Sequence, residues 1–232
     1  MAKLLIVIPA LNEALTLPSL IGDILKISPS ADILVVDDSS SDNTREAAVV
    51  AGASVLSLSN QLGPWAATQC GIRYGVDRGF DSVITMDADG QHSPEFIPIL
   101  IEKYRESIPN IVIGGGAHRG SSAQHFAWKL MRCASGLSIT DLTSGFRFYD
   151  RQACELLASR RASFLEHQDV GVLSMAVNAG LVVEEVKVEM RARAHGESRI
   201  FGSWAKICRY MLSTMLLGFS KRPLFKPRGR HL

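Results

Sequence analysis

The sequence predicts an α/β fold, a mostly parallel open sheet flanked by helices. Through the first half of the chain, short and continuously apolar segments alternate with segments of helical periodicity. Strands that are apolar on both faces belong to a sheet covered on both sides, and their alternation with helices favours parallel pairing. Ligands of such sheets bind beyond the carboxyl ends of the strands. Functional residues are therefore expected just after each strand.

Each element of the first half follows from this pattern. The expected strands are 4–8, 33–36, 53–58, 83–86 and 111–113, and the expected helices are 14–27, 42–51, 63–78 and 94–106. Asp42 and Ser93 are of the residue types that cap helix N-termini, and Pro94 suits a first helical turn. The second half is less regular. There we expect helices at 122–136 and 169–179 and strands at 145–149 and 181–189, followed by a basic loop containing glycine.

Length and composition favour one substantial core. The chain has 232 residues, of which 47% are hydrophobic, so a single domain is the default expectation. The four cysteines, at 70, 133, 154 and 208, form no C-x-x-C pair, and the N-terminus leads directly into an apolar strand. We therefore expect free thiols, no signal peptide and a reducing cytosol. No apolar run reaches the ~18 residues that a spanning helix needs.

The charge of the chain is unevenly distributed. The formal net charge is +2, but no acid follows Glu197, whereas eight Lys and Arg residues do. The first 197 residues carry 17 basic and 23 acidic residues, so they are negative where the tail is positive. This asymmetry indicates an anionic partner for the tail, either a membrane surface or a nucleic acid.

Acidic residues follow three of the expected strands. The segments are PALNE (9–13) after the first strand, DDSSSDNT (37–44) after the second and DADGQ (87–91) after the fourth. Carboxylates at this edge suit ribose hydroxyls, base N–H groups and a divalent cation, but they repel phosphate unless a metal intervenes. An acidic nucleotide site at this edge therefore predicts a metal.

The DADGQ segment is the candidate metal site. Asp87 and Asp89 alternate along an extended backbone, and a bend permitted by Gly90 can direct both carboxylates into one crevice. With a neutral oxygen from Gln91, these hard ligands favour Mg²⁺ or Mn²⁺. Such a cation would neutralise a diphosphate and stabilise its charge as it leaves. Taken alone, D-x-D after a strand is also a common turn.

Six motifs together indicate a family. In order they are IVIPALNE, VVDDSSSDNT, LGPWAATQCGI, MDADGQHSPE, DLTSGFRFYDR and RARAHGESRI. Over about residues 4–202 the chain resembles the inverting glycosyltransferases of family 2, and within them the dolichyl-phosphate mannosyltransferase and polyprenyl-phosphate glycosyltransferase branch. The resemblance implies the Rossmann-like GT-A fold. It divides the chain into a glycosyltransferase domain, 1–202, and an interface helix with a basic tail, 203–232.

The resemblance also implies residue roles. The nucleotide sugar would lie against Pro9, Ala10, Leu11, Asn12, Glu13, Asp37, Asp38, Asp87, Ala88 and Asp89, with Asp37 or Asp38 contacting base or ribose. The metal ligands would be Asp87, Asp89 and Gln91. The implied catalytic residues are Asp89, Arg147 and Asp169, and the implied phosphate- and acceptor-binding residues are Arg119, Ser144, Arg193, Ser198 and Arg199.

The chain departs from the family pattern at three places. It has GGGAHRG where the family often has G-S-R, which displaces the arginine to Arg119, and Gly90 stands where the lipid-phosphate branch usually has Leu. His167 is unusual in FLEHQDVG, and the functional residue of that segment is left open among Glu166, His167 and Asp169.

The acceptor determines which residues the reaction needs. A hydroxyl acceptor requires a carboxylate such as Asp169 to take its proton. A lipid monophosphate is already ionised at neutral pH, so it needs positioning by arginines, a role that suits Arg147, Arg193 and Arg199. We expect metal-dependent, inverting transfer of one sugar, from a donor of the GDP-mannose or UDP-glucose type, to a polyprenyl or dolichyl phosphate at the cytoplasmic membrane face.

The tail favours a lipid acceptor independently of the resemblance. Its apolar residues follow helical spacing: Trp204, Ile207, Cys208, Met211, Leu212, Met215, Leu216 and Phe219. A basic segment, SKRPLFKPRGR, comes next, and the combination is typical of a chain lying in a membrane interface. The alternative is a helix packed on the protein's own core or on a partner. Nucleic acid is not expected, because the aromatics lie on the apolar stripe instead of among the basic residues.

Other functions compete with this interpretation. They are transfer to a sugar hydroxyl in polysaccharide or glycan synthesis, synthesis of the sugar nucleotide, and nucleotide-sugar binding by a non-catalytic subunit. Sugar-nucleotide synthesis is disfavoured because PALNE lacks a Gly-rich basic loop. Many relatives append spanning helices, so a separate integral membrane protein is a conceivable partner.

Overall fold

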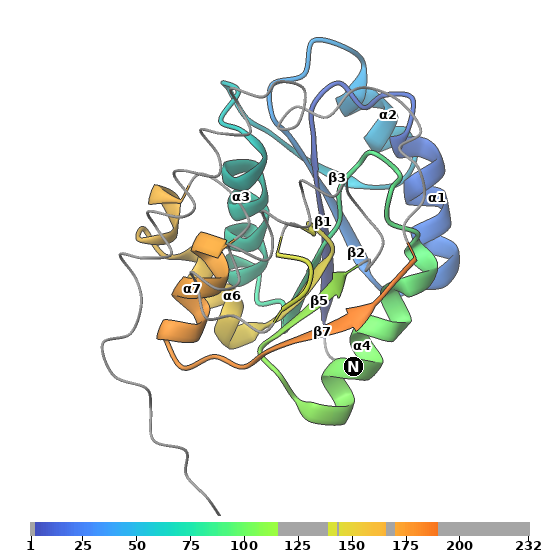
Figure 1. The fold of residues 1–232 in the computed structure, drawn as a ribbon. Helices are drawn as coiled ribbons and strands as arrows, with labels where there is room; N and C mark the ends of the chain where they lie inside the picture. Colours follow the sequence, from blue (N-terminus) through green and yellow to red (C-terminus); the bar gives the residue numbers. More distant parts are fainter. Residues whose placement is uncertain (1–2, 116–138, 143, 166–169, 190–232) are drawn as a thin grey trace, which may run out of the picture.

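The computed structural model describes residues 3–115, 139–142, 144–165 and 170–189 (Figure 1). Its centre is a seven-stranded sheet in the order β3-β2-β1-β4-β6-β5-β7. The strands are β1 (Leu4–Ala10), β2 (Asp32–Asp37), β3 (Ser54–Ser57), β4 (Ser82–Thr85), β5 (Ile111–Gly115), β6 (Arg147–Asp150) and β7 (Val183–Lys187). Only the pairs that involve β6 are antiparallel among these strands. The α/β class with a mostly parallel sheet is confirmed.

Helices cover both faces of the sheet (Figure 1). On one side pack α1 (Leu17–Ile27), α2 (Thr44–Val50) and α4 (Ile97–Ser107), and on the other α3 (Pro64–Asp77), α6 (Arg151–Ala158) and α7 (Val170–Asn178). Successive residues of β1 enter the two cores in turn: Leu5 and Val7 pack on the α3 side, and Ile6 and Ile8 on the α1 side. Burial on both faces explains why these strands are apolar throughout.

The predicted elements match the observed ones with shifted ends. The expected helix 94–106 divides into a 3₁₀ turn, η1 (Pro94–Phe96), and α4, with Pro94 in the first turn as predicted. Asn43 and not Asp42 occupies the N-cap position of α2, which begins at Thr44, although the Asp42 carboxylate accepts a hydrogen bond from Thr44 N at 3.0 Å. Ser93 precedes η1, but its side chain makes no capping hydrogen bond. The expected helix 122–136 lies outside the described residues.

β6 begins at the edge where the parallel strands end. It is antiparallel to β4 and β5, and Arg147 at its start lies opposite Thr85 and Ile113. The residues just before β6 therefore lie beside the carboxyl ends of both neighbours. Functional residues were expected just after the ends of strands. The residues just before β6 lie at the same edge of the sheet and are therefore candidates too.

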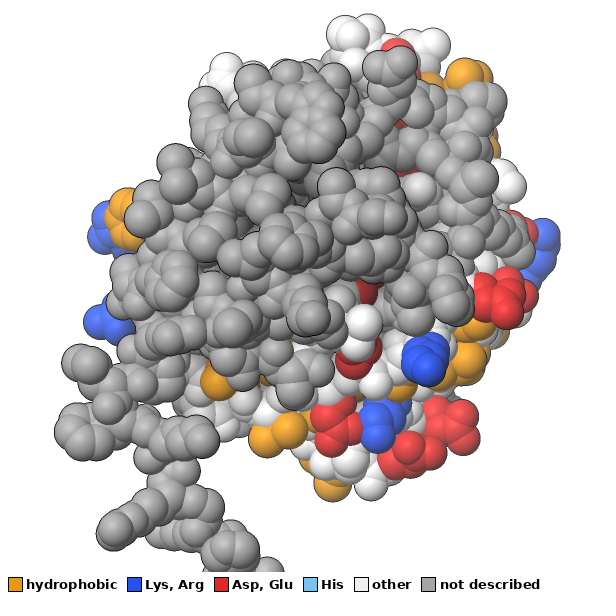
Figure 2. Space-filling view, viewed as in Figure 1, with side chains coloured by type: hydrophobic (Ala, Val, Ile, Leu, Met, Phe, Trp, Pro, Cys, Tyr) orange, Lys and Arg blue, Asp and Glu red, His pale blue; other side chains and the backbone are white. Residues whose placement is uncertain are grey.

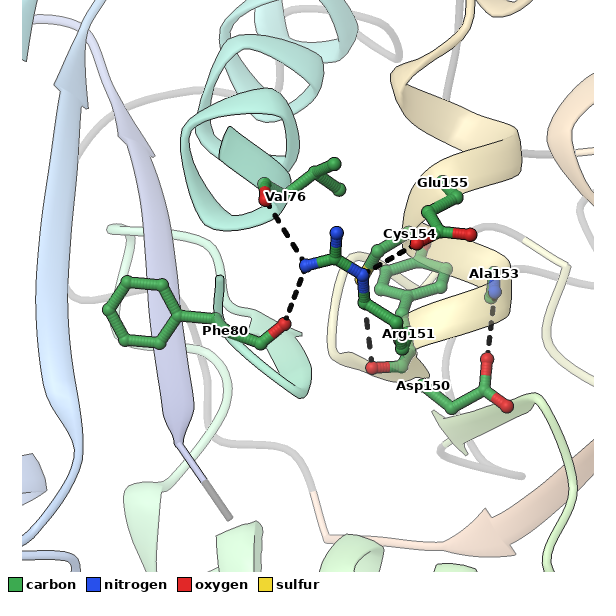
Figure 3. Close-up of polar contacts among 8 residues, drawn as sticks. Val76, Phe80, Asp150, Arg151, Ala153, Cys154 and Glu155 are labelled. Carbon is green, nitrogen blue, oxygen red and sulfur yellow. Dashed lines mark hydrogen bonds and ion pairs between the residues drawn. The ribbon is translucent and has the colours of Figure 1, made fainter. Parts of the chain in front are cut away.

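The helix α6, which the sequence analysis did not predict, is tied to α3 (Figure 3). The Asp150 carboxylate accepts a hydrogen bond from Ala153 N at 2.7 Å and caps α6. Arg151 donates to the carbonyls of Val76 and Phe80, both at 3.1 Å, and pairs with Glu155 at 2.7 Å. A 3₁₀ turn, η2 (Ala162–Phe164), follows the helix.

The surface around α4 and β7 carries charges of both signs (Figure 2). Lys103 on α4 pairs with Glu184 on β7 at 2.8 Å, and this contact raises the pKa of Lys103 and lowers that of Glu184. Mixed charge gives this part of the surface no strong preference for anions.

Within the described ranges, none of the helices has the length and apolarity to span a bilayer. In the same ranges Cys70 and Cys154 are free thiols.

Candidate active site

The loops after β1 and β2 are joined by polar side chains. Asn12, in the left-handed region at φ 58°, accepts hydrogen bonds through Oδ1 from the backbone N–H and the hydroxyl of Ser41, at 2.8 and 3.2 Å. Asn12 N donates to Ser40 Oγ at 3.0 Å, and Glu13 N donates to Thr44 Oγ1 at 2.8 Å. The predicted nucleotide residues of PALNE and DDSSSDNT therefore form one hydrogen-bonded unit.

Asp42 anchors this unit although it is exposed. Its carboxylate accepts hydrogen bonds from the Thr44 hydroxyl, from Thr44 N at 3.0 Å and from Ala14 N at 3.3 Å. Partial burial would raise the pKa of Asp42, but these hydrogen bonds outweigh it and lower the pKa below its usual value. Asp42 thus favours its charged form in the folded loops.

The two neighbouring acids at the end of β2 are bound differently. Both oxygens of Asp38, which is 3% exposed, accept backbone hydrogen bonds from Leu62 (2.7 Å) and Gly63 (2.9 Å). Asp37, also buried, accepts one hydrogen bond from Ser40 N at 3.0 Å through a single oxygen. Asp38 therefore holds the loop that leads into α3, where Gly63 has φ 94°.

The DADGQ segment has the predicted bend. Gly90 lies in the left-handed region, at φ 72°, and Asp89 Oδ1 accepts a hydrogen bond from Gln91 N at 3.0 Å. Asp89 is 8% exposed and Asp87 is partly buried. Gly90 serves here because an L side chain rarely adopts this backbone conformation.

The oxygen donors of this segment fit a hard divalent cation that completes its coordination elsewhere. Within the described parts of the chain, no three His, Cys, Asp or Glu side chains are grouped to hold a metal. The predicted donor set is the carboxylates of Asp87 and Asp89 and the amide oxygen of Gln91. Mg²⁺ is commonly held by one or two carboxylates together with substrate phosphates and water, so this set fits Mg²⁺ or Mn²⁺ bound with a diphosphate.

The segment before β6 closes the site from the other side. Ser144, fully buried, donates through Oγ to Gly114 O at 2.6 Å, and its N–H donates to the Asp141 carboxylate at 3.1 Å. Both oxygens of Glu185 accept backbone hydrogen bonds, from Thr140 (2.7 Å) and Asp141 (2.8 Å). Asp141 and Glu185 are residues that the sequence analysis missed, since nothing local pairs β7 with this loop.

Arg147 is fully buried at the start of β6. Its Nε donates to Ser144 O at 2.8 Å and its Nη2 to Leu142 O at 2.9 Å. Its Nη1 is also buried, and no described residue accepts a hydrogen bond from it. Arg147 therefore holds the loop before β6 in place.

His92 directly follows the DADGQ segment and packs against Phe146. It is 2% exposed, and its ring centroid lies 5.2 Å from that of Phe146. This position is consistent with a histidine that orders the segment, and it places Phe146, another residue that the sequence analysis did not single out, against the same loop.

Comparison with known proteins identifies the family. The model of "Glycosyl transferase family 2" matches residues 5–158. The chain belongs to glycosyltransferase family 2. It is therefore an enzyme, a glycosyltransferase, and the resemblance inferred from the six motifs is confirmed.

Two curated relatives match most of the glycosyltransferase. The undecaprenyl-phosphate mannosyltransferase of Micrococcus luteus is 31% identical over 219 residues, which cover 86% of this chain and 88% of that protein. The polyprenol monophosphomannose synthase of Mycolicibacterium smegmatis is 28% identical over 218 residues, covering 87% and 82%. Both matches fit the polyprenyl-phosphate branch of the family.

Solved structures support the GT-A fold of this glycosyltransferase. Glucosyl-3-phosphoglycerate synthase from Mycobacterium tuberculosis, in complex with Mn²⁺, UDP-glucose and phosphoglyceric acid, matches with a TM-score of 0.75. The sequence identity is 21%, and the match covers 96% of this chain and 82% of that one. A complex of the same synthase with Mg²⁺ and UDP gives 0.73 at 21% identity, covering 96% and 81%.

Several predicted residues of the glycosyltransferase lie outside the described residues. They are Arg119, Glu166, His167, Asp169, Arg193, Ser198 and Arg199, together with the predicted interface helix and tail, 203–232. Their roles stay predictions. The described site residues come from the ends of β1, β2 and β4 and the start of β6.

Proposed function

We propose that this glycosyltransferase transfers one sugar, with inversion, from a nucleoside-diphosphate sugar to a polyprenyl phosphate. The main supporting observation is the bent loop after β4: its Asp87 carboxylate lies against Gly145, just before β6, and its Asp89 accepts a hydrogen bond from Gln91 N within the bend. The names of the two curated relatives support a polyprenyl-phosphate acceptor, because each is matched along more than four fifths of its length.

The donor is assigned to the unit formed by the loops after β1 and β2. Of the two acids there, Asp37 is the better candidate for base or ribose, because both oxygens of Asp38 are already bound by Leu62 and Gly63. Pro9, Ala10 and Leu11 would line the same pocket. The donor base and sugar, of the GDP-mannose or UDP-glucose type, are selected by the shape of this pocket.

The diphosphate is assigned to the DADGQ segment. A divalent cation, Mg²⁺ or Mn²⁺, held by Asp87, Asp89 and Gln91 would stabilise the charge that develops on the leaving nucleoside diphosphate. Asp87 and Asp89 contribute negative charge and hard oxygen ligands, and Ala88 between them brings only backbone to the donor. Asp89, nearly buried and bonded to Gln91 N, is the better fixed by described contacts.

The acceptor phosphate is assigned to arginines. Arg147 carries a buried positive charge, and no carboxylate pairs with it among the described residues. A buried cation is costly unless an anion or hydrogen bonds compensate it. Its Nη1 is suited to a phosphate or sugar oxygen, with Ser144, Arg119, Arg193, Ser198 and Arg199 as further candidates. An ionised phosphate needs orientation more than a base, which leaves Asp169 a role only with a hydroxyl acceptor.

The direct test is a transfer assay. The protein is incubated with Mn²⁺, radiolabelled GDP-mannose or UDP-glucose, and undecaprenyl phosphate in detergent. We expect label in the organic phase as a glycolipid, and its loss when a chelator is added. Donor hydrolysis without glycolipid would contradict the proposal. Label on a water-soluble saccharide, abolished by Asp169→Asn but not by Arg193→Ala or Arg199→Ala, would indicate the hydroxyl alternative.

We place the enzyme peripherally on the inner face of the membrane, attached through residues 203–232. Flotation with phosphatidylglycerol vesicles tests the attachment: the full chain should float, and a chain ending at residue 202 should stay at the bottom. Equal flotation of both chains would refute attachment through residues 203–232.

A separate integral membrane protein is proposed to use the glycolipid. Recovery of the enzyme alone from detergent-solubilised membranes would count against this partner.

A further inference from the structure

The Asp87 carboxylate rests directly on the backbone of Gly145. A Cβ placed on Gly145 would lie 2.5 Å from Oδ2 of Asp87, 2.7 Å from Oδ1 and 2.8 Å from Cγ. All three distances are shorter than nonbonded contacts in proteins allow. The absence of a side chain at residue 145 is thus what leaves room for this carboxylate at the end of β4.

The backbone conformation of Gly145 does not require glycine. Its φ lies outside the left-handed region, so alanine could adopt the same backbone conformation. At Gly71 and Gly114, by contrast, a Cβ would meet the buried side chains of Val7 at 2.2 Å and Phe146 at 2.6 Å. A methyl group at those two positions would disturb the core, whereas at Gly145 the group that must move is the end of one Asp side chain.

The backbone that carries Gly145 is held in place from both neighbouring strands. Gly145 O accepts a buried hydrogen bond from the Thr85 hydroxyl at 2.7 Å, two residues before Asp87. On the other side, Ser144 Oγ donates to Gly114 O at 2.6 Å and Gly114 N donates to Phe146 O at 2.9 Å. The surface beneath Asp87 therefore cannot easily yield, and a methyl group there would displace the carboxylate instead.

We propose that Gly145 is a positioning residue for the metal-binding carboxylate of Asp87. This inference rests on the proposed metal-dependent function and adds a residue to it. Displacing the carboxylate from 2.5 Å to an ordinary contact moves it by about 0.5 Å or more, which is the tolerance within which a functional group must be held. Changes to residues that orient a metal ligand typically cost roughly 10- to 100-fold in metal affinity.

The test compares Gly145→Ala with Gly22→Ala, whose added Cβ meets no atom within 4 Å. Mn²⁺ binding is measured by electron paramagnetic resonance with GDP, and separately with UDP, present. We expect Gly145→Ala to raise the Mn²⁺ dissociation constant roughly 10-fold or more and to shift the melting temperature by no more than ~2 °C. Gly22→Ala should leave Mn²⁺ affinity unchanged.

A second variant tests the support beneath the glycine. Thr85→Val removes the hydrogen bond to Gly145 O while keeping the side-chain shape, and it should weaken Mn²⁺ binding in the same direction but less.

The possible results distinguish a failure of the proposed metal site from a failure of the positioning role of Gly145. Wild-type protein that binds no Mn²⁺ with either nucleotide would overturn the metal site and this inference together. Normal Mn²⁺ binding by Gly145→Ala, with tight binding by wild type, would overturn the positioning role alone. A large fall in melting temperature alongside weaker binding would also overturn it, since the substitution would then act on the whole fold.

Discussion

The two sides of the candidate active site are built in different ways. The predicted nucleotide side, residues 9–16 and 37–44, is joined through one exposed side chain, Asn12, and one buried side chain, Thr44, which link segments about 30 residues apart. The metal side, residues 85–92 and 144–147, is joined through buried groups about 60 residues apart, including the Thr85 hydroxyl and the carbonyl of Gly145. On the nucleotide side, substitutions of the residues that join the two loops should therefore affect loop order or stability, whereas on the metal side substitutions should affect ligand binding.

The largest effect is expected at Asp89. Asp89→Asn keeps an oxygen that can accept from Gln91 N but removes the negative charge. If Asp89 holds the metal, sugar transfer should fall by roughly 100-fold or more, because charge stabilisation at a leaving group is worth that much. The radiolabel transfer assay measures it, with Asp32→Asn, an exposed acid at the opposite end of β2, as the matched control. Near wild-type transfer by Asp89→Asn at limiting Mn²⁺ would exclude this role.

A smaller effect should separate the two acids at the end of β2. Asp38→Ala leaves the N–H groups of Leu62 and Gly63 without their acceptor, so we expect the free energy of unfolding to fall by about 2 kcal/mol. Asp37→Ala should instead weaken donor binding with a lesser loss of stability. Urea unfolding and donor-dependent thermal shift measure the two properties. The assignment is reversed if Asp38→Ala weakens the donor while leaving stability intact.

The proximity of the loops after β1 and β2 could be predicted from sequence because the information needed is local. Each loop follows an apolar strand directly, and parallel pairing alone brings the ends of β1 and β2 together, so naming residues 9–13 and 37–44 required no long-range contact. The bend at Gly90 was equally local, since glycine is the residue that adopts φ 72° without strain. The different roles of Asp37 and Asp38 could not be predicted from sequence, because they depend on where the backbone N–H groups of residues 62 and 63 lie.

The metal side was only partly predictable for the opposite reason. Nothing in the motif S-G-F-R says that its strand is inserted antiparallel between β4 and β5, yet that insertion brings Gly145 to Asp87 and Phe146 to His92. The helix α6 was within reach: Asp150 is a good N-cap, and Ala153, Cys154 and Leu157 have helical apolar spacing. Burial in the core also raises the pKa of the Cys154 thiol to about 12, so this thiol stays protonated at neutral pH and is unreactive.

The smallest expected effect is a pH dependence of stability that comes from Asp42, on the nucleotide side. Hydrogen bonds from Thr44 and Ala14 lower the pKa of Asp42 below its usual 3.8, against the opposing effect of partial burial. A lowered folded-state pKa contributes stability that is present above the usual value and is lost as the pH falls through the folded value. Asp42→Asn removes that contribution, so the difference in urea midpoint between wild type and Asp42→Asn should be steady near neutral pH and shrink below about pH 4. Because Asp42 is exposed, the difference should be small and should not alter Mn²⁺ affinity. A difference that is independent of pH would mean that the Asp42 charge does not hold these loops together, and their order would then rest on Asn12 and Thr44.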